Sequence, residues 1–169
     1  MYTARFAVAA DENNILNLYK TVAQNVGGIA RQADEITPQY VANNLHKSLA
    51  NGVCVVVENP ANAAELVAEI HCYKLEPRVF AHVLSELTIV VHPNFQGKGL
   101  GKLIFTTLLE HVKHNKPDIL RVELIARESN TKAIAFYQSL GFRIEGRLEK
   151  RISSHTGTLE ADIPMAWLR

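Results

Sequence analysis

The stretch that decides the fold is Val91-His92-Pro93-Asn94-Phe95-Gln96-Gly97-Lys98-Gly99-Leu100-Gly101-Lys102. A β-rich run precedes it, glycine occupies every second position from Gly97 to Gly101, and an apolar stripe at helical spacing follows. Glycine lets the backbone approach a ligand closely and adopt dihedral angles that side chains disfavour. Successive amides at a helix N-terminus attract an anion. The segment therefore predicts a strand-to-helix turn with an anion site; the alternative is a tight turn that binds nothing.

Two common nucleotide-binding motifs do not fit this glycine loop. A Walker loop needs four residues between its glycines, whereas three separate Gly97 from Gly101. It also needs Ser or Thr after its lysine, where this chain has Leu103. A dinucleotide fingerprint needs a third glycine three positions after Gly99, and Lys102 stands there. The spacing therefore disfavours both kinds of nucleotide site.

Periodicity outward from the loop predicts one mixed α/β domain in the order strand, two helices, three strands, helix, strand, helix and two strands, with an antiparallel meander in the middle and a crossover unit after it. Asp11, Thr37 and Asn130 are each placed to cap a helix. Pro164 favours an edge position for the last strand, because proline cannot donate to a sheet ladder. The expected strands are 2–9, 53–58, 66–75, 84–91, 120–126, 142–152 and 159–167, with a turn at 59–64. One expected helix follows each of the three caps, and a fourth spans 99–114.

Composition and charge narrow the classes of function. The chain has 169 residues, 47% of them hydrophobic and 21% charged, which fits one globular domain. A net charge of +1 gives no global field for nucleic acid or an anionic membrane, so we expect neither as a partner. The segment 92–116 nevertheless holds four lysines against one glutamate. Positive charge is therefore concentrated around the glycine loop.

The N-terminus and the cysteines bear on location. Residues 1–10 contain no continuous apolar core of signal-peptide length. The longest apolar runs are five residues, against the 20 or so that a membrane-spanning helix needs. Cys54 and Cys72 lie in apolar, strand-like stretches and predict two buried free thiols in a reducing compartment. We therefore expect a cytoplasmic protein.

Two separate segments resemble one known family. Gln96-x-x-Gly99-x-Gly101 after a strand resembles motif A of the GCN5-related N-acetyltransferases (GNAT), and Asn130-x-x-Ala133-x-x-x-Tyr137 followed by Gly141-Phe142 resembles motif B. The resemblance covers nearly the whole chain in element order and implies a single N-acetyltransferase domain over 1–169. It implies a mixed, mostly antiparallel sheet of about seven strands flanked by about four helices. It also implies a splayed parallel pair at 86–91 and 120–126.

The resemblance implies acetyl-coenzyme A as the acetyl donor, bound in that opening. Backbone groups of the first splayed strand would bind the pantetheine, and amides of the glycine loop would bind the pyrophosphate. Gly97 departs from the family, where many members carry arginine, but the contact there is mainly through the backbone. The implied cofactor-binding residues are Ile89, Val90, Val91, Gln96, Gly97, Lys98, Gly99, Leu100, Gly101, Lys102, Asn130 and Phe136.

Acetyl transfer to an amine sets three chemical requirements. The amine must be neutral, and a lysine-like amine has a pKa of about 10.4, so neutralising it at pH 7 costs about 4 to 5 kcal/mol. The thioester oxygen needs donors, for which the strand amides near Ile89 are candidates. The departing thiolate benefits from a proton, which the resemblance assigns to Tyr137. The base stays open between Glu86, Glu123 and no single glutamate.

The acceptor side carries weaker signals. Glu69 and His71 are further candidates for the base, and together with Tyr40 and Tyr73 they are candidates for binding the acceptor. Seven histidines give no metal-ligand pattern, so we expect no metal. The function that these residues imply is acetyl transfer to a primary amine of a small molecule, amino acid or peptide N-terminus, with a homodimer possible. The alternative is a non-catalytic acyl-coenzyme A sensor of the same fold.

Overall fold

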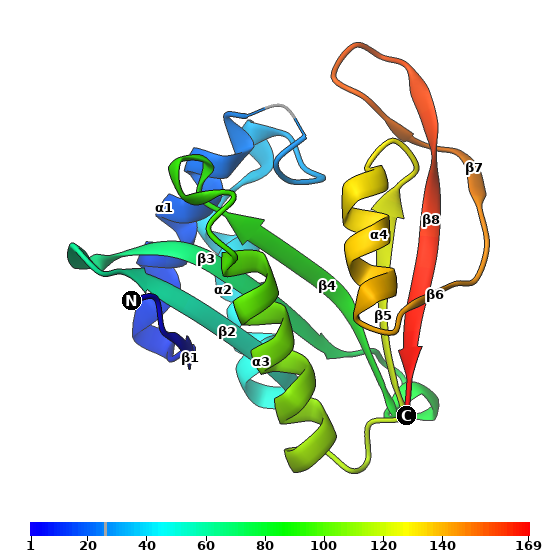
Figure 1. The fold of residues 1–169 in the computed structure, drawn as a ribbon, viewed down its shortest axis with the longest axis horizontal. Helices are drawn as coiled ribbons and strands as arrows, with labels where there is room; N and C mark the ends of the chain where they lie inside the picture. Colours follow the sequence, from blue (N-terminus) through cyan, green and yellow to red (C-terminus); the bar gives the residue numbers. More distant parts are fainter. Residues whose placement is uncertain (26) are drawn as a thin grey trace. The chain divides into compact units, whose positions relative to one another are not determined.

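The computed structural model describes residues 1–25 and 27–169 (Figure 1). Its strands are β1 (Ala4–Phe6), β2 (Gly52–Asn59), β3 (Asn62–Lys74), β4 (Val83–Val91), β5 (Arg121–Arg127), β6 (Arg143–Ile144), β7 (Leu148–Ser153) and β8 (Leu159–Leu168). Its α-helices are α1 (Glu12–Ala23), α2 (Pro38–Asn51), α3 (Leu100–Asn115) and α4 (Thr131–Ser139). Hydrogen bonds link the strands in the order β1-β2-β3-β4-β5-β8-β6, and β7 also pairs with β8. The sheet is mostly antiparallel with a parallel β4–β5 pair, which confirms the predicted mixed α/β class.

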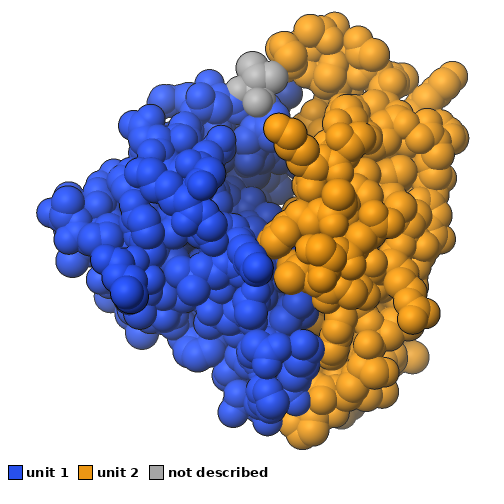
Figure 2. Space-filling view, viewed as in Figure 1, with its two compact units in different colours: residues 1–73, 88–116 blue, residues 74–87, 117–169 orange. Residues whose placement is uncertain are grey.

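The chain forms two compact units, coloured separately in Figure 2. The first comprises residues 1–73 and 88–116, and the second comprises residues 74–87 and 117–169. Strand β4 contributes its first part to the second unit and its last part, from Thr88, to the first.

In the first unit, helices cover both faces of β2. Five consecutive residues, Val53 to Val57, are buried, as expected for a strand that is covered on two sides. Cys54 and Val56 join the core formed by α1 and α2. Their neighbours in the strand point to the opposite face, because side chains alternate along a strand. Figure 1 shows α3 on that face of β2.

Sequence signals place most helix ends correctly. The Thr37 hydroxyl accepts a hydrogen bond from the Tyr40 amide (3.1 Å), and Pro38 is the first residue of α2. Asn130 caps α4 in the same way, accepting from the Ala133 amide at 3.3 Å. Both bonds satisfy amides that have no acceptor within the helix. The predicted caps of α2 and α4 are therefore confirmed.

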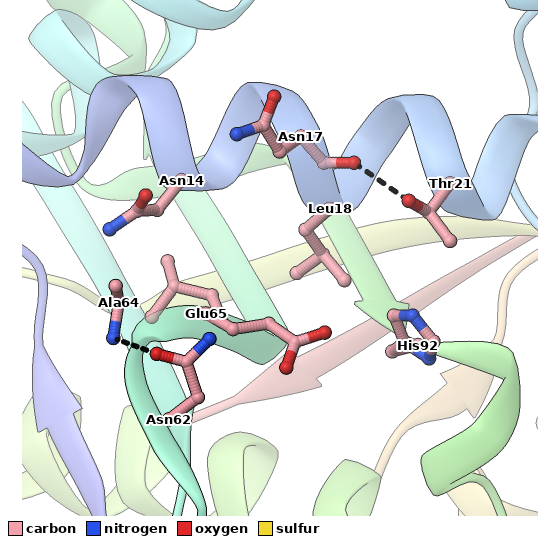
Figure 3. Close-up of a pocket in the computed structure, with 9 residues that line it drawn as sticks. Asn14, Asn17, Leu18, Thr21, Asn62, Ala64, Glu65 and His92 are labelled. Carbon is pink, nitrogen blue, oxygen red and sulfur yellow. Dashed lines mark hydrogen bonds between the residues drawn. The ribbon is translucent and has the colours of Figure 1, made fainter.

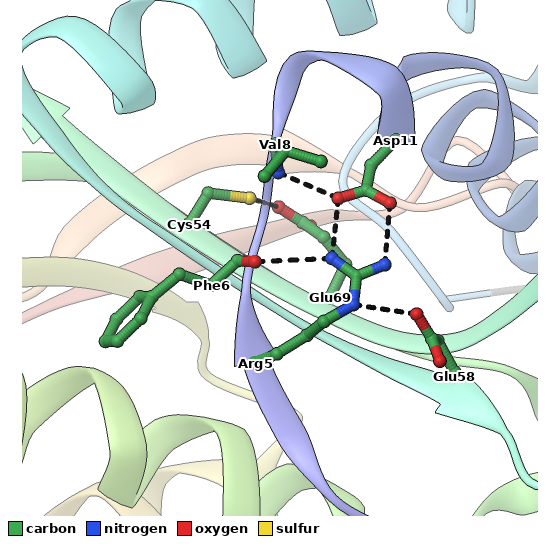
Figure 4. A network of polar contacts seen from close by, with 7 residues as sticks. All are labelled: Arg5, Phe6, Val8, Asp11, Cys54, Glu58 and Glu69. Carbon is green, nitrogen blue, oxygen red and sulfur yellow. Dashed lines mark hydrogen bonds and ion pairs between the residues drawn. The ribbon is translucent and has the colours of Figure 1, made fainter.

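Asp11 does not cap α1 as predicted, because its carboxylate is bound by Arg5 (Figure 4). The Arg5 guanidinium donates to both carboxylate oxygens at 2.8 Å and to Glu58 at 2.7 Å. The Val8 amide donates to the same carboxylate at 2.8 Å. In the described part of the chain, the Asp11 side chain makes no hydrogen bond to the first turn of α1. Asp11 therefore ties the start of α1 to Arg5 of β1 rather than capping the helix, and Arg5 in turn binds Glu58 of β2.

Two further details of the sequence prediction were wrong. The turn expected at 59–64 is shorter, because β2 continues to Asn59 and β3 begins at Asn62. The strand expected at 142–152 is interrupted and forms the two strands β6 and β7. This interruption is one reason why the sheet has eight strands rather than about seven.

In the second unit, β8 lies between partners on both sides. It pairs with β5 along seven residue positions, from Arg121↔Leu168 to Arg127↔Asp162, and with β6 and β7 on its other side. The edge position predicted from Pro164 is therefore wrong. The carbonyl of Pro164 accepts from the Glu145 amide (2.9 Å), so its missing N–H faces the gap between β6 and β7. An interior strand tolerates this proline because the ladder is already broken there.

No helix among residues 1–25 and 27–169 is long and apolar enough to cross a membrane. Both cysteines are buried free thiols, as predicted.

The Asp11–Arg5 contact gives a testable pH dependence. Replacing Asp11 by Asn should lower the free energy of unfolding at pH 7 by about 1–2 kcal/mol, because charged hydrogen bonds are lost. Arg5 holds the pKa of Asp11 below its usual value. The stabilisation is therefore present above the pKa of the unfolded chain and is lost as the pH falls through the lower folded value. Urea unfolding should show the difference at pH 7 and a smaller one at pH 3.

A matched control comes from an exposed ion pair on α3. Glu110 contacts Lys113 at 2.8 Å, and about half of its side chain is exposed, so Glu110→Gln should leave the unfolding midpoint unchanged. An Asp11→Asn effect of equal size at both pH values would contradict the assignment of this stabilisation to the carboxylate.

Candidate active site

The glycine loop joins β4 to α3 in the first unit. After β4, a 3₁₀ turn spans Pro93–Phe95, and α3 begins at Leu100. Gly97 and Gly99 have φ values of 73° and 77°, in the left-handed region that L side chains disfavour. Gly99 is the residue immediately before the helix, so its conformation sets the direction in which α3 starts. Gly101 lies inside the first turn and a Cβ there would meet no atom within 4 Å.

Contacts on either side hold the loop in place. The His92 amide donates to the Val67 carbonyl of β3 at 2.8 Å, and the Phe95 amide donates to the His92 carbonyl at 2.8 Å. The Lys98 ammonium lies 4.5 Å from the centre of the Phe95 ring. The first amides of α3 have no acceptor within the helix, as at every helix start. The loop therefore offers amides and positive charge on a fixed turn, which suits a phosphate group.

A shallow groove of about 500 Å³ runs along α3 from this loop. Its lining residues are Gly99, Lys102, Leu103, Thr106, Thr107 and Glu110. Lys98 and Lys102 are both exposed. Buried residues on the opposite side of the helix, such as Ile104 and Leu108, fix α3 in the first unit. The predicted loop residues, 96–102, thus lie together at one end of a groove.

The remaining predicted cofactor residues fall in both units. Ile89, Val90 and Val91 form the end of β4 in the first unit, directly before the loop. Asn130 and Phe136 belong to α4 and its cap in the second unit. The Asn130 side-chain oxygen caps α4, so it holds the helix start in addition to any ligand contact.

Glu86 occupies a strained position in β4. Its φ of 55° is unusual for a residue other than glycine, and its side chain is exposed. Strand β4 pairs in parallel with β5 just before Glu86, at Val83↔Arg121 and Leu84↔Val122. Backbone strain of this kind persists where the surroundings enforce it, and it clusters at functional sites. Both the carboxylate side chain of Glu86 and its strained backbone thus make it a candidate base.

Glu123 has a cationic partner within the second unit. Arg121 Nε lies 2.7 Å from its carboxylate, and the same guanidinium binds Glu145. The Glu123 carboxylate is therefore engaged by a guanidinium of its own unit. Glu86 and Glu123 are both kept as candidate bases.

Tyr137 lies on α4 between two aromatic neighbours. Its ring centre is 5.7 Å from that of Phe136 and 6.2 Å from that of Phe142. Burial raises the pKa of Tyr137 above its ordinary value. The phenol therefore keeps its proton at neutral pH, as a proton donor must.

The predicted acceptor residues Glu69, His71 and Tyr73 lie on β3, and Glu69 contacts two residues that were not predicted. Tyr19 of α1 donates to Glu69 at 2.5 Å. Figure 4 shows the Cys54 thiol donating to the other carboxylate oxygen, at 3.2 Å. The Tyr19 hydroxyl in an otherwise apolar helix stripe was the available signal. Nothing in the sequence around Cys54 indicates its contact with Glu69.

Tyr40 and Tyr73 each lie near a cation of the same chain. The Arg31 guanidinium is 3.8 Å from the centre of the Tyr40 ring, and the Lys47 ammonium is 5.3 Å from that of Tyr73. Such geometry shows that both rings accept a positive group on their faces. Tyr40 also lies beside Tyr19, with ring centres 6.3 Å apart.

A second pocket in the first unit was not predicted (Figure 3). It measures about 290 Å³, and α1, the start of β3 and His92 line it with amide and hydroxyl groups and the Glu65 carboxylate. Asn62 and Thr21 make hydrogen bonds to neighbouring backbone groups, so part of this polar lining is already satisfied.

Among the residues that the structure describes, no group of three or more side chains could hold a metal ion.

Comparison with curated proteins finds short matches. A 63-residue segment is 40% identical to the [Ribosomal protein bS18]-alanine N-acetyltransferase of Salmonella typhimurium, covering 36% of this chain and 41% of that protein. A 67-residue segment is 33% identical to the spermidine N(1)-acetyltransferase of Escherichia coli, covering 40% of this chain and 36% of that protein. The matches thus span well under two thirds of these relatives.

Solved structures agree with the fold over nearly the full chain. An acetyltransferase of the GNAT family from Streptococcus pneumoniae superposes with a TM-score of 0.88 at 19% identity, covering 100% of both chains. A phosphinothricin acetyltransferase from Sinorhizobium meliloti in complex with AcCoA gives 0.84 at 19% identity, covering 99% of this chain and 88% of that one. The profile of the Acetyltransferase (GNAT) family matches residues 14–142, more than half of the sequence. The chain therefore belongs to the GNAT acetyltransferase family.

Proposed function

We propose that this protein is an acetyl-coenzyme A-dependent N-acetyltransferase that acetylates a primary amine of a small molecule, an amino acid or a peptide N-terminus. The observation that carries the proposal is the glycine loop, which presents amides and lysines at the start of α3 in a chain of this family. The related proteins named above acetylate, by their names, a ribosomal-protein alanine and spermidine. Both acceptors fall within the proposed class.

On the cofactor side, backbone groups of Ile89, Val90 and Val91 bind the pantetheine, as an added strand would. Amides from Gly97 to Lys102 bind the pyrophosphate, with positive charge from Lys98 and Lys102. Gln96, Asn130 and Phe136 complete the binding residues. The left-handed glycines and the fixed turn support this assignment, because they expose amides that a bulkier loop would cover.

The chemistry is direct attack of the neutral amine on the thioester carbonyl carbon. Strand amides near Ile89 stabilise the oxygen as it gains charge. Tyr137 donates the proton that the departing sulfur needs; its phenol is protonated at neutral pH, because burial raises its pKa. Glu86 and Glu123 are the glutamate candidates for removing the amine proton. Tyr40, Tyr73, Glu69 and His71 bind the acceptor.

The wider setting belongs to the same proposal. Residues 1–169 act as one acetyltransferase domain, located in the cytoplasm, whose partners are the amine acceptor and possible second copies of the chain in a homodimer. No metal, nucleic acid or membrane takes part. The alternative is a non-catalytic acyl-coenzyme A sensor, which experiment must distinguish from the proposed enzyme.

Binding of acetyl-coenzyme A is the first test. Calorimetry should detect binding at micromolar concentrations, and its absence at high micromolar cofactor contradicts the proposal. Gly101→Ala should weaken binding about tenfold, or about 1.4 kcal/mol, because a methyl group intrudes where the phosphate approaches the backbone. The fold should tolerate the change, because a Cβ at Gly101 meets no protein atom within 4 Å. Gly146→Ala, where the nearest atom is 3.8 Å away in the second unit, is the control and should leave affinity unchanged.

Tyr137→Phe separates an enzyme from a sensor. Loss of the phenolic proton should lower kcat by about 100-fold, the usual size of general acid catalysis, without changing acetyl-coenzyme A affinity. Release of free thiol across a panel of amines measures the rate. Tyr2→Phe is the matched control, because its ring contacts Phe95 and no hydrogen bond of its hydroxyl is recorded in the described structure. Cofactor binding with no transfer to any amine would identify a sensor.

A further inference from the structure

His92 is the residue at which β4 passes into the glycine loop (Figure 3). Its amide donates to the Val67 carbonyl of β3 at 2.8 Å, and its carbonyl accepts from the Phe95 amide at 2.8 Å. Its imidazole Nδ1 accepts from the Asn94 amide at 3.2 Å. The first bond holds His92 to the sheet, and the other two hold the turn to His92.

The bond to the imidazole fixes which ring nitrogen carries the proton. A backbone N–H can only donate, so Nδ1 has its lone pair toward Asn94, and the proton of the neutral ring lies on Nε2. His92 is half-buried and lines the pocket of about 290 Å³ in the first unit, which has room for water beside the ring. The imidazole therefore acts toward the turn as an acceptor.

The His92 side chain holds the 3₁₀ turn at Pro93–Phe95 in two ways. Nδ1 caps the turn, as a serine or asparagine oxygen caps an α-helix. The ring also packs edge-on against that of Phe95, with centres 5.3 Å apart and planes 86° apart. Within the turn, the Gln96 amide donates to the Pro93 carbonyl at 3.4 Å, a long distance for such a bond. The imidazole therefore supplements a turn that is weakly bonded on its own.

The glycine loop has little else to hold it beyond this turn. The amides of residues 97–99 make no hydrogen bond to any other residue that the structure describes. Glycine loses more conformational freedom than any other residue when its backbone is fixed. The next bond along the chain is the one from the Leu103 amide to the Gly99 carbonyl, 3.0 Å long, at the start of α3. The loop is thus held at two ends, by His92 before it and by α3 after it.

The Phe95 ring extends the hold of His92 to a charge in the loop. The Lys98 ammonium lies 4.5 Å from the centre of this ring, within the range of a cation–π attraction. Tyr2 of the N-terminal segment packs edge-on against the same ring, with centres 6.3 Å apart. A shift of the turn would therefore move the ring, the ammonium and the loop amides together.

From these contacts we propose that His92 is a positioning residue for the acetyl donor: its imidazole holds the glycine loop in the conformation that receives the pyrophosphate of acetyl-coenzyme A. This inference rests on the proposed function and adds a residue outside the predicted cofactor-binding set. His92 acts through Asn94 and Phe95 and takes no part in the chemical step. A loop that is ordered before binding reduces the entropy cost of binding. The effect should therefore appear in donor affinity and not in kcat.

Two substitutions separate the cap from the rest of the side chain. His92→Leu keeps an apolar side chain but cannot accept a hydrogen bond, whereas the side-chain oxygen of His92→Asn can cap the turn. Calorimetry should show acetyl-coenzyme A binding weakened about fivefold by His92→Leu, the size expected for one hydrogen bond, and held within about twofold of wild type by His92→Asn. His46→Leu, at an exposed histidine of α2, is the matched control and should bind as wild type does. Wild-type affinity of His92→Leu, or an equal loss in both His92 variants, overturns the proposal.

A truncated donor distinguishes positioning of the loop from general damage to the fold. S-acetylpantetheine carries the thioester and the pantetheine but no pyrophosphate. His92→Leu should lower kcat/KM about fivefold with acetyl-coenzyme A, leave its kcat unchanged, and leave kcat/KM with S-acetylpantetheine within about twofold of wild type. An equal loss of kcat/KM with both donors overturns the inference.

A measurement on the wild-type protein covers the case in which His92→Leu fails to fold. ¹⁵N-histidine NMR should show the Nε2–H tautomer for His92, and a proton on Nδ1 overturns the proposal. If wild type binds no acetyl-coenzyme A, the proposed function itself fails, and that result is distinct from tight binding by both wild type and His92→Leu.

Discussion

The structure depends on one constraint at the end of β4: the chain must enter α3 with its first amides uncovered. A side chain at Gly99 would disfavour the left-handed backbone that aims the helix, and the helix would start in another direction. Because α3 packs on β2 through its buried face, its direction is tied to the core of the first unit. The backbone bond from His92 to Val67 ties the same turn to β3. The glycine loop and the core are therefore fixed by the same few residues.

Local signals in the sequence were sufficient for most of the fold. The Thr37 and Asn130 caps, the glycine loop and the apolar stripes each act within a few residues, so their outcomes could be predicted. Asp11 shows where local reasoning stops, because the competing Arg5 belongs to a neighbouring strand. Pro164 shows the same limit, because its tolerance depends on where the opposite strand breaks. Neither partner can be identified from helix capping or strand propensity.

The candidate site also has a part that local sequence signals locate and a part that depends on long-range contacts. The turn at residues 96–102 could be located from the sequence because its residues are consecutive, and their role in binding stays a prediction. Glu69 and His71 were visible as alternating polar residues in a strand, but their importance comes from Tyr19, about fifty positions earlier in the chain. A tyrosine on a helix stripe resembles any core aromatic until its hydroxyl is seen to meet a buried carboxylate. Long-range polar contacts of this kind need three-dimensional coordinates.

The position of Pro164 affects how the sequence between β6 and β7 can vary in evolution. Its missing donor faces the break between β6 and β7, while the ladder from β8 to β5 continues unbroken on the other side. Insertions or replacements in the segment 145–147 therefore cost few ladder hydrogen bonds. The segment between β6 and β7 can thus diversify in length and chemistry while β5 keeps its register.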